Sequence, residues 1–178
     1  DALIAKAQTA AGAFSIAAEE FCLRSKDLLL FDQKSRSRGY EWFDLWLNTE
    51  IRQSETFQGI RECARSLYNT LEKLIKATRD IVAYAEQVDD TSSAQRELAL
   101  VALELRELYE ALDVVFFHES DNNVYSVRLN RTKALLDEVF TVQPLDIGKS
   151  LNESLYQETR SVIYASATLS IDGQFDAF

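Results

Sequence analysis

Residues 57–88 read FQGIRECARSLYNTLEKLIKATRDIVAYAEQV, and their apolar spacing predicts one long helix. Apolar side chains recur in it at alternating steps of three and four residues, with one polar member. The members of this seam are Phe57, Ile60, Ala64, Leu67, Leu71, Leu74, Thr78, Ile81, Ala85 and Val88. Such spacing places an apolar stripe along one face of a helix about 48 Å long. A helix of this length needs a partner that covers the stripe.

The partner is expected directly downstream, where a second seam has the same spacing. Its members are Leu98, Val101, Leu105, Leu108, Leu112 and Val115. Residues 89–92 (DDTS) interrupt the pattern, and Ser92 with Gln95 fits a capping box at the start of a new helix. A short polar connection between two long seams predicts an antiparallel helical hairpin whose seams bury against each other.

The N-terminal stretch is expected to add a third helix over about residues 1–24. Its apolar positions, spaced like those of the two seams, are Leu3, Ala7, Ala10, Phe14, Ala17 and Phe21. Residues 34–39 (KSRSRG) read as an exposed loop. Beyond them we expect a short aromatic helix from Tyr40 to about Gln53, with Trp42 and Trp46 on one face because they are four residues apart.

The character of the chain changes after about residue 119. Residues 124–129 (VYSVRL) alternate as a half-buried strand does, and residues 139–142 (VFTV) form a second strand candidate. Residues 146–158 look helical, and residues 161–165 (SVIYA) read as a fully buried strand. The expected fold class is therefore mainly α with a small β portion. An antiparallel long-helix bundle occupies residues 1–120, and a strand-containing segment occupies residues 121–178.

Composition narrows the class of protein. With 47% hydrophobic and 27% charged residues the 178-residue chain is globular, and its 5 glycines and 1 proline argue against an all-β fold. A net charge of −10 gives no reason to expect a stand-alone nucleic-acid binder. No membrane span or signal peptide is recognised, and 2 cysteines indicate a reducing, cytoplasmic compartment. Because it starts at Asp1 and contains no Met, we expect a piece of a larger polypeptide.

Few residues are candidates for chemistry. His118 falls at the end of the second long helix, where a structural surface role is expected. One histidine and two distant cysteines, Cys22 and Cys63, argue against a metal site. Residues 148–150 (GKS) resemble the end of a phosphate-binding loop, but Gln143 stands where that loop needs a glycine. We therefore expect neither a metal nor a nucleotide cofactor in this chain.

A basic cluster is the positive patch that the sequence offers. Its members are Arg24, Lys26, Lys34, Arg36 and Arg38. Aromatic residues follow at once, and basic side chains beside aromatic ones suit single-stranded nucleic acid. The candidate DNA-binding residues are Arg24, Lys34, Arg36 and Arg38. The alternative is an exposed loop next to a core aromatic helix.

The C-terminal segment carries a family resemblance. Residues 161–170 (SVIYASATLS) resemble the Ser-Ala-Thr motif strand of superfamily 2 helicases. The longer pattern, with Gly173, Phe175 and Phe178 after the motif, is similar to the DinG-like branch of the XPD/DinG helicases. Residues 124–127 (VYSV) and 142–148 (VQPLDIG), with Leu151 and Leu155 after them, also look like that family's stretch before the motif strand. The resemblance is specific over about residues 124–178 and only architectural over residues 1–120.

The resemblance implies a parent that is an ATP-dependent 5′-to-3′ DNA helicase. In that family a helical Arch domain is inserted in the first motor domain, between the Asp-Glu-Ala-His box and the Ser-Ala-Thr strand. The Arch forms one wall of a pore for single-stranded DNA. By resemblance, Ser166 and Thr168 would couple ATP hydrolysis to the grip on DNA. The implied partners are the remaining motor domains of the same polypeptide and single-stranded DNA, with ATP and Mg as cofactors of the parent.

The chain also departs from the helicase pattern. It has no Gly-x-x-x-x-Gly-Lys-Thr loop, no Asp-Glu-Ala-His box, no second motor domain and no four-cysteine iron–sulfur signature. Alone it should therefore be inactive, and whether the parent carries an iron–sulfur cluster stays open. A monomer is favoured, because a seam buried inside one chain leaves nothing to recruit a partner helix. The alternative function is a noncatalytic, acidic helical module that binds another protein through its heptad seam.

Overall fold

The computed structural model describes residues 2–32, 41–87, 92–132, 137–161 and 163. The chain forms two compact units, Asp1–Gln143 and Pro144–Phe178. Each unit is described below by itself. In the first unit, the β2–β3 hairpin groups with the helical body, because the sheet and the helices share one hydrophobic core.

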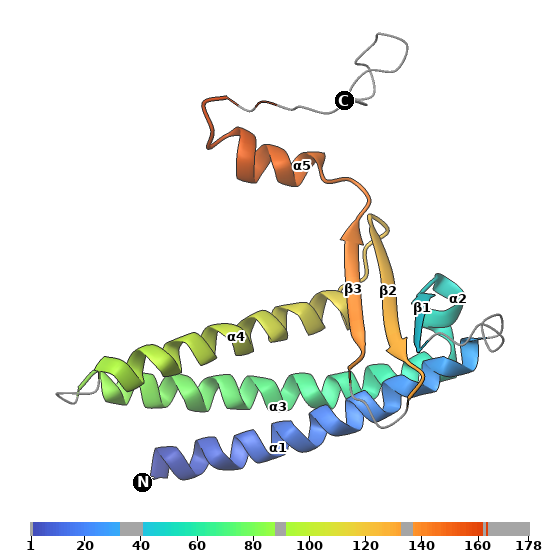
Figure 1. Ribbon diagram of the computed structural model, residues 1–178. Coiled ribbons are helices and arrows are strands. Elements are labelled where there is room, and N and C mark those ends of the chain that lie inside the picture. The colour runs from blue at the N-terminus through green and yellow to red at the C-terminus, as the bar shows by residue number, and fades with distance from the viewer. Residues whose placement is uncertain (1, 33–40, 88–91, 133–136, 162, 164–178) are drawn as a thin grey trace. The chain divides into compact units, whose positions relative to one another are not determined.

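Long antiparallel helices form the body of the first unit, as the apolar spacing predicts. They are α1 (Ala2–Ser25), α3 (Glu55–Ala85) and α4 (Ser92–Phe116). Both α1 and α4 pack against α3, which lies between them in Figure 1. Lys6 near the start of α1 donates to Asp80 near the end of α3 at 2.7 Å, which fits their opposite directions. The hairpin and the third helix are thus confirmed.

Local signals explain where α3 starts. The Ser54 hydroxyl accepts a hydrogen bond from the backbone N–H of Phe57 at 3.2 Å, so Ser54 caps the helix. Before it, the short helix α2 (Thr49–Gln53) is capped by Asn48, whose side chain accepts from the backbone N–H of Ile51 at 2.9 Å. The 3-10 segment η1 (Lys26–Phe31) continues α1 and leads to the sheet.

The small sheet contains β1 (Trp42–Trp46), β2 (Asn123–Asn130) and β3 (Val139–Pro144) in that order. Both strands predicted in the region of residues 124–142 are confirmed. The aromatic helix predicted from Tyr40 to Gln53 is wrong at residues 42–46, where β1 pairs antiparallel with β2. The reason is that aromatic residues suit a pleated surface, and β2 supplies the hydrogen-bonding partner from far along the chain. Only the α2 portion is helical.

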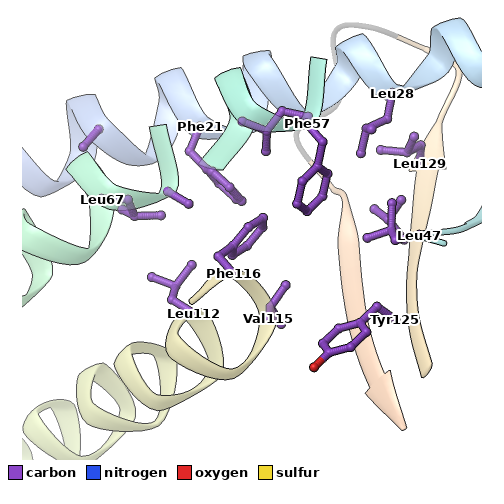
Figure 2. Packing of buried hydrophobic residues seen from close by; sticks show 14 of the residues in the cluster. Phe21, Leu28, Leu47, Phe57, Leu67, Leu112, Val115, Phe116, Tyr125 and Leu129 are labelled. Atoms are coloured by element: carbon purple, nitrogen blue, oxygen red, sulfur yellow. The ribbon is translucent and has the colours of Figure 1, made fainter. Parts of the chain in front are cut away.

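An aromatic cluster ties the three long helices to the sheet. Figure 2 shows Phe21 of α1, Phe57 of α3 and Phe116 of α4 directed toward one another. The ring centroids of Phe21 and Phe116 lie 5.4 Å apart edge to face, and Phe140 of β3 lies 5.1 Å from Phe116. Burial of each such side chain stabilises the fold by about 1.5–3 kcal/mol. The sheet therefore closes one end of the helical bundle.

The α4 seam differs from the predicted one. The prediction that the two seams bury against each other is confirmed at Leu105, Leu112 and Val115, whereas Val101 and Leu108 are 45% and 40% exposed. Tyr109 and Phe116 of α4 pack in the same core as Leu105, Leu112 and Val115, so the buried stripe is shifted toward these rings. The reason is that large aromatic rings fill the interface: Tyr109 stacks on Tyr68 of α3 with centroids 4.0 Å apart. An apolar strip of α4 is left on the surface.

The second unit contains the short helix α5 (Gly148–Leu151) and a π-helical turn, η2 (Asn152–Tyr156). These elements confirm the helix predicted over residues 146–158. Of the strand predicted over residues 161–165, residues 162, 164 and 165 lie outside the described part of the chain. The Ser-Ala-Thr segment that follows also lies outside it.

Candidate functional site

The outward side of the sheet presents both tryptophans of the chain. Successive side chains of a strand point to opposite faces, so Phe43 and Leu45 pack on the core while Trp42, Asp44 and Trp46 face away from it. The Trp42 and Trp46 side chains are 41% and 64% exposed. Large aromatic side chains are normally covered, so two of them on one open face indicate a contact surface.

An ion pair lies between the tryptophans on this face. Arg128 of β2 stands opposite Asp44 of β1. Its Nε donates to Asp44 Oδ1 at 2.7 Å and its Nη2 donates to Oδ2 at 3.4 Å, a two-point contact. The hydrogen bond to Asp44 raises the pKa of Arg128 above its usual value, so the guanidinium stays charged.

Two open hollows flank the ion pair. One of about 690 Å³ is lined by Glu41, Trp42, Asp44, Arg128 and Val139. The other, of about 250 Å³, shares Asp44, Arg128 and Val139 and adds Ser126, Thr141 and Gln143. We call the face carrying Trp42, Asp44, Trp46, Arg128 and Val139 the outer sheet surface. Its indoles can stack with flat rings, and its guanidinium can contact a phosphate.

Arg24 is the one predicted DNA-binding residue within the described part of the chain. It lies near the end of α1, where its Nη1 pairs with Asp27 Oδ2 at 2.7 Å. It lines a hollow between α1 and α3 together with Glu19, Glu20 and Glu62. Its immediate surroundings are therefore acidic. Lys34, Arg36 and Arg38 lie outside the described residues, as do the predicted coupling residues Ser166 and Thr168.

Lys26, another member of the basic cluster, is buried rather than available to a ligand. Its ammonium pairs with Glu138 and donates to the backbone carbonyl of Asn130 at 3.0 Å. Nearby, Arg131 Nε lies 2.7 Å from Asp32 Oδ2. Both pairs join η1 to the connection between β2 and β3. No sequence signal could find them, because the partners are about a hundred residues apart.

Arg52 is a second buried cation that sequence reasoning missed. Its Nε donates to Glu119 at 2.5 Å, and its Nη2 donates to the carbonyl of Val115 at 3.1 Å. The guanidinium carbon also lies 4.2 Å from the centre of the Tyr125 ring. Arg52 thus ties α2 to the end of α4 and to β2, which is a structural role.

The remaining reactive side chains fit structural roles. His118 Nδ1 lies 2.6 Å from Asp113 Oδ2 in an exposed pair at the end of α4, where a surface role was expected. Burial raises the pKa of both the Cys22 and Cys63 thiols, with the carboxylates of Glu138 and Glu20 adding to the effect, so neither favours the nucleophilic thiolate. In the part of the chain that the structure describes, no group of three or more metal-binding side chains comes together.

In the segment that resembles a phosphate-binding loop, the backbone N–H of Gly148 is already hydrogen-bonded to a neighbouring side chain. The backbone N–H of Gly148 donates to the Asp146 carboxylate at 2.8 Å. A carboxylate at this position repels a phosphate. This geometry agrees with the mismatch at Gln143 in the sequence.

Comparisons with protein-family models, with curated proteins and with solved structures find no significant match to this chain. Among the helices that the structure describes, none has the length and apolarity that a membrane span requires.

Proposed function

We propose that the chain is the Arch-like region, with the returning Ser-Ala-Thr strand, of a cytoplasmic ATP-dependent 5′-to-3′ DNA helicase of the DinG/XPD type. The observation that carries the proposal is the sequence of residues 161–170, preceded in the expected order by residues 124–127 and 142–148. In this role the chain works only together with the motor domains that supply the ATP and Mg site.

The topology of the first unit supports an insertion of this kind. The long α3–α4 hairpin lies between β1 and β2 in the sequence, yet β1 and β2 pair with each other. The hairpin therefore leaves the sheet and returns to it at the neighbouring strand. An excursion that begins and ends at adjacent strands can be inserted in a motor domain without disturbing it.

The exposed tryptophans support a contact with single-stranded DNA. Trp42 and Trp46 face away from the core, whereas the alternative of a core aromatic helix requires them to be covered. The strand that carries them follows directly on the segment with Lys34, Arg36 and Arg38. Cations that neutralise phosphates, beside rings on which bases stack, suit a strand that is bound without sequence preference.

Ser166 and Thr168 are assigned the coupling role. Hydroxyl side chains at the carboxyl end of a buried strand lie where α/β sheets place their functional groups. In the parent helicase, Thr168→Ala should abolish unwinding while DNA-stimulated ATP hydrolysis continues. Thr9→Ala on the exposed side of α1 is the matched control and should leave both activities unchanged. Unwinding that survives Thr168→Ala would refute the assigned role.

The parent gene offers a direct check. The helicase proposal requires an Asp-Glu-Ala-His box encoded shortly before Asp1, and the isolated chain should show no ATPase activity. A parent without that box excludes the helicase.

The second candidate function is the noncatalytic interaction module. The apolar residues left on the surface of α4 favour it, because Leu100 and Leu103 are 62% and 53% exposed. Size-exclusion chromatography with light scattering separates the two functions. A stable homodimer formed through residues 57–115 favours the module, and a monomer favours the helicase region.

A further inference from the structure

A groove on the side of the helical body combines apolar and acidic walls. It has a volume of about 660 Å³ and lies between α1 and α3. Its walls include Ile16, Glu19, Glu20, Leu23, Gly59 and Glu62. All of these residues belong to the first unit, so the groove is formed within one compact body.

Gly59 lets the Arg24 guanidinium lie low between α1 and α3, on the floor of the groove. It stands near the start of the long helix α3, where glycine is a poorer helix former than alanine or glutamine. A Cβ atom at position 59 would lie 2.7 Å from the Nη2 atom of Arg24. The missing side chain thus leaves room in which the Arg24 guanidinium lies against the helix backbone.

Two apolar side chains stand exposed along the groove. Ile16 and Leu23 are 69% and 53% exposed. They are seven residues apart on α1, which puts them on one side of the helix, two turns and about 10 Å from each other. Apolar anchors on a docked amphipathic helix repeat at the same interval, so the two surfaces match in spacing.

The negative charge of the groove favours a positively charged partner. Glu19, Glu20, Asp27 and Glu62 line it, and Arg24, the cation among the lining residues, is already paired with Asp27. The chain as a whole carries −10. A second copy would bring more negative charge to the same place, whereas lysine or arginine side chains would find carboxylates on both walls.

We propose that this groove docks a cationic amphipathic helix of a partner protein. The apolar face of that helix packs on Ile16 and Leu23, beside the Arg24 guanidinium that covers Gly59. Its basic side chains lie against Glu19, Glu20 and Glu62. The groove shares Arg24 with the predicted DNA-binding residues, but the inference uses none of residues 124–127, 142–148 and 161–170, which carry the helicase proposal.

Binding of a defined probe tests the proposal. The probe is a fluorescein-labelled 18-residue helix of leucine and lysine with one apolar face, followed by fluorescence anisotropy. Replacing Glu19, Glu20 and Glu62 by Gln should raise its Kd at least tenfold. The matched control replaces the exposed residues Glu50, Glu72 and Glu86, which lie outside the groove, removes the same charge, and should raise the Kd less than threefold. If both triple variants bind the probe equally weakly, binding reflects only non-specific attraction between the cationic probe and the acidic chain. That result would overturn the proposal.

The variant Gly59→Gln tests the shape of the groove without removing a charge. Glutamine favours the helix, and Arg24 can swing away because only the end of its flexible side chain is in the way. The thermal midpoint should therefore stay unchanged or rise, while probe binding falls at least tenfold. Unchanged binding by this folded variant would refute docking in the groove.

Cys63 lies in the groove and reports on its occupancy. In a Cys22→Ser background, saturating probe should slow the reaction of Cys63 with iodoacetamide at least fivefold, and a sequence-scrambled probe without an apolar face should not. Equal slowing by both peptides, or by neither, contradicts the proposal. A homodimer in sedimentation that is lost in Gly59→Gln would instead assign the groove to a second copy.

Discussion

Asp44 and Arg128 lie opposite each other on β1 and β2, with the Arg128 Nε donating to Asp44 Oδ1 at 2.7 Å. The pair is exposed and stands between the two tryptophans of the outer sheet surface. Because the carboxylate neutralises the guanidinium, a phosphate must compete with Asp44 for Arg128. The tryptophan rings face no such competition.

This relationship predicts how the outer sheet surface contributes to DNA binding in the parent helicase. Trp46→Ala should weaken the binding of oligo(dT) by about 1–3 kcal/mol, because one stacking platform is lost. Asp44→Asn should tighten binding and steepen its salt dependence, since it frees Arg128 for a phosphate. Fluorescence anisotropy at several salt concentrations measures both effects.

Tyr84→Ala is the control for the tryptophan variant. Tyr84 is a similarly exposed aromatic residue, 59% exposed, but it lies at the far end of α3, away from the sheet. Its loss should leave DNA binding unchanged. Equal effects of Trp46→Ala and Tyr84→Ala would show that the outer sheet surface has no special part in binding.

The aromatic cluster should dominate the stability of the first unit. Phe57 is completely buried and stacks near Phe116 with ring centroids 5.9 Å apart. Phe57→Ala should lower the free energy of unfolding by about 3–5 kcal/mol, from lost burial and the cavity left behind. Urea denaturation followed by circular dichroism measures the change. Ile16→Ala, at a position 69% exposed, should cost less than about 0.5 kcal/mol.

The helices could be predicted because their signal is local. A stripe repeating at steps of three and four residues over residues 57–88 has no alternative interpretation as a strand. Burial along α4 could not be predicted equally well. The apolar residues of α4 cover more than one face, so the choice between Leu108 and Tyr109 depends on the ring of Tyr68 across the interface.

Strand β1 was missed for a geometric reason. Residues four apart share a face on a helix and also on a strand, so the spacing of Trp42 and Trp46 fits both. What decides in favour of the strand is pairing with β2, where Trp42 stands opposite Asn130. That partner is outside any local window. The same holds for the candidate site, since Arg128 reaches Asp44 only through this pairing.

The buried pair of Lys26 and Glu138 should be more important than any surface ion pair. Both side chains are almost fully covered, with exposures of 6% and 2%. Glu138→Ala leaves the ammonium only the more distant Asp137 carboxylate, 3.9 Å away, and should destabilise the first unit by about 3 kcal/mol. Thermal unfolding monitored by circular dichroism measures the loss.

A double variant shows whether the cost comes from the unpaired charge. Lys26→Met with Glu138→Leu removes both charges and keeps the volume, so most of the stability should return. If the double variant is as unstable as Glu138→Ala alone, the loss comes from packing and not from an uncompensated ammonium.

The reactivity of the Cys63 thiol should depend on pH in a direction set by its raised pKa. Burial raises the pKa of the Cys63 thiol above its ordinary value, and the nearby Glu20 carboxylate raises it further. The thiolate is the reactive form, so alkylation by iodoacetamide at pH 8 should be slower than for a cysteine in an unfolded peptide. The folded state holds the proton more tightly than the unfolded state does. The thiol's stabilising contribution is therefore complete below the unfolded pKa and is lost as the pH rises through the folded pKa.

Replacing Glu20 by Gln in a Cys22→Ser background should speed alkylation of Cys63 at pH 8. Glu72→Gln, on the same helix as Cys63 but farther along it, should not. An unchanged rate in Glu20→Gln would show that the carboxylate does not act on the thiol.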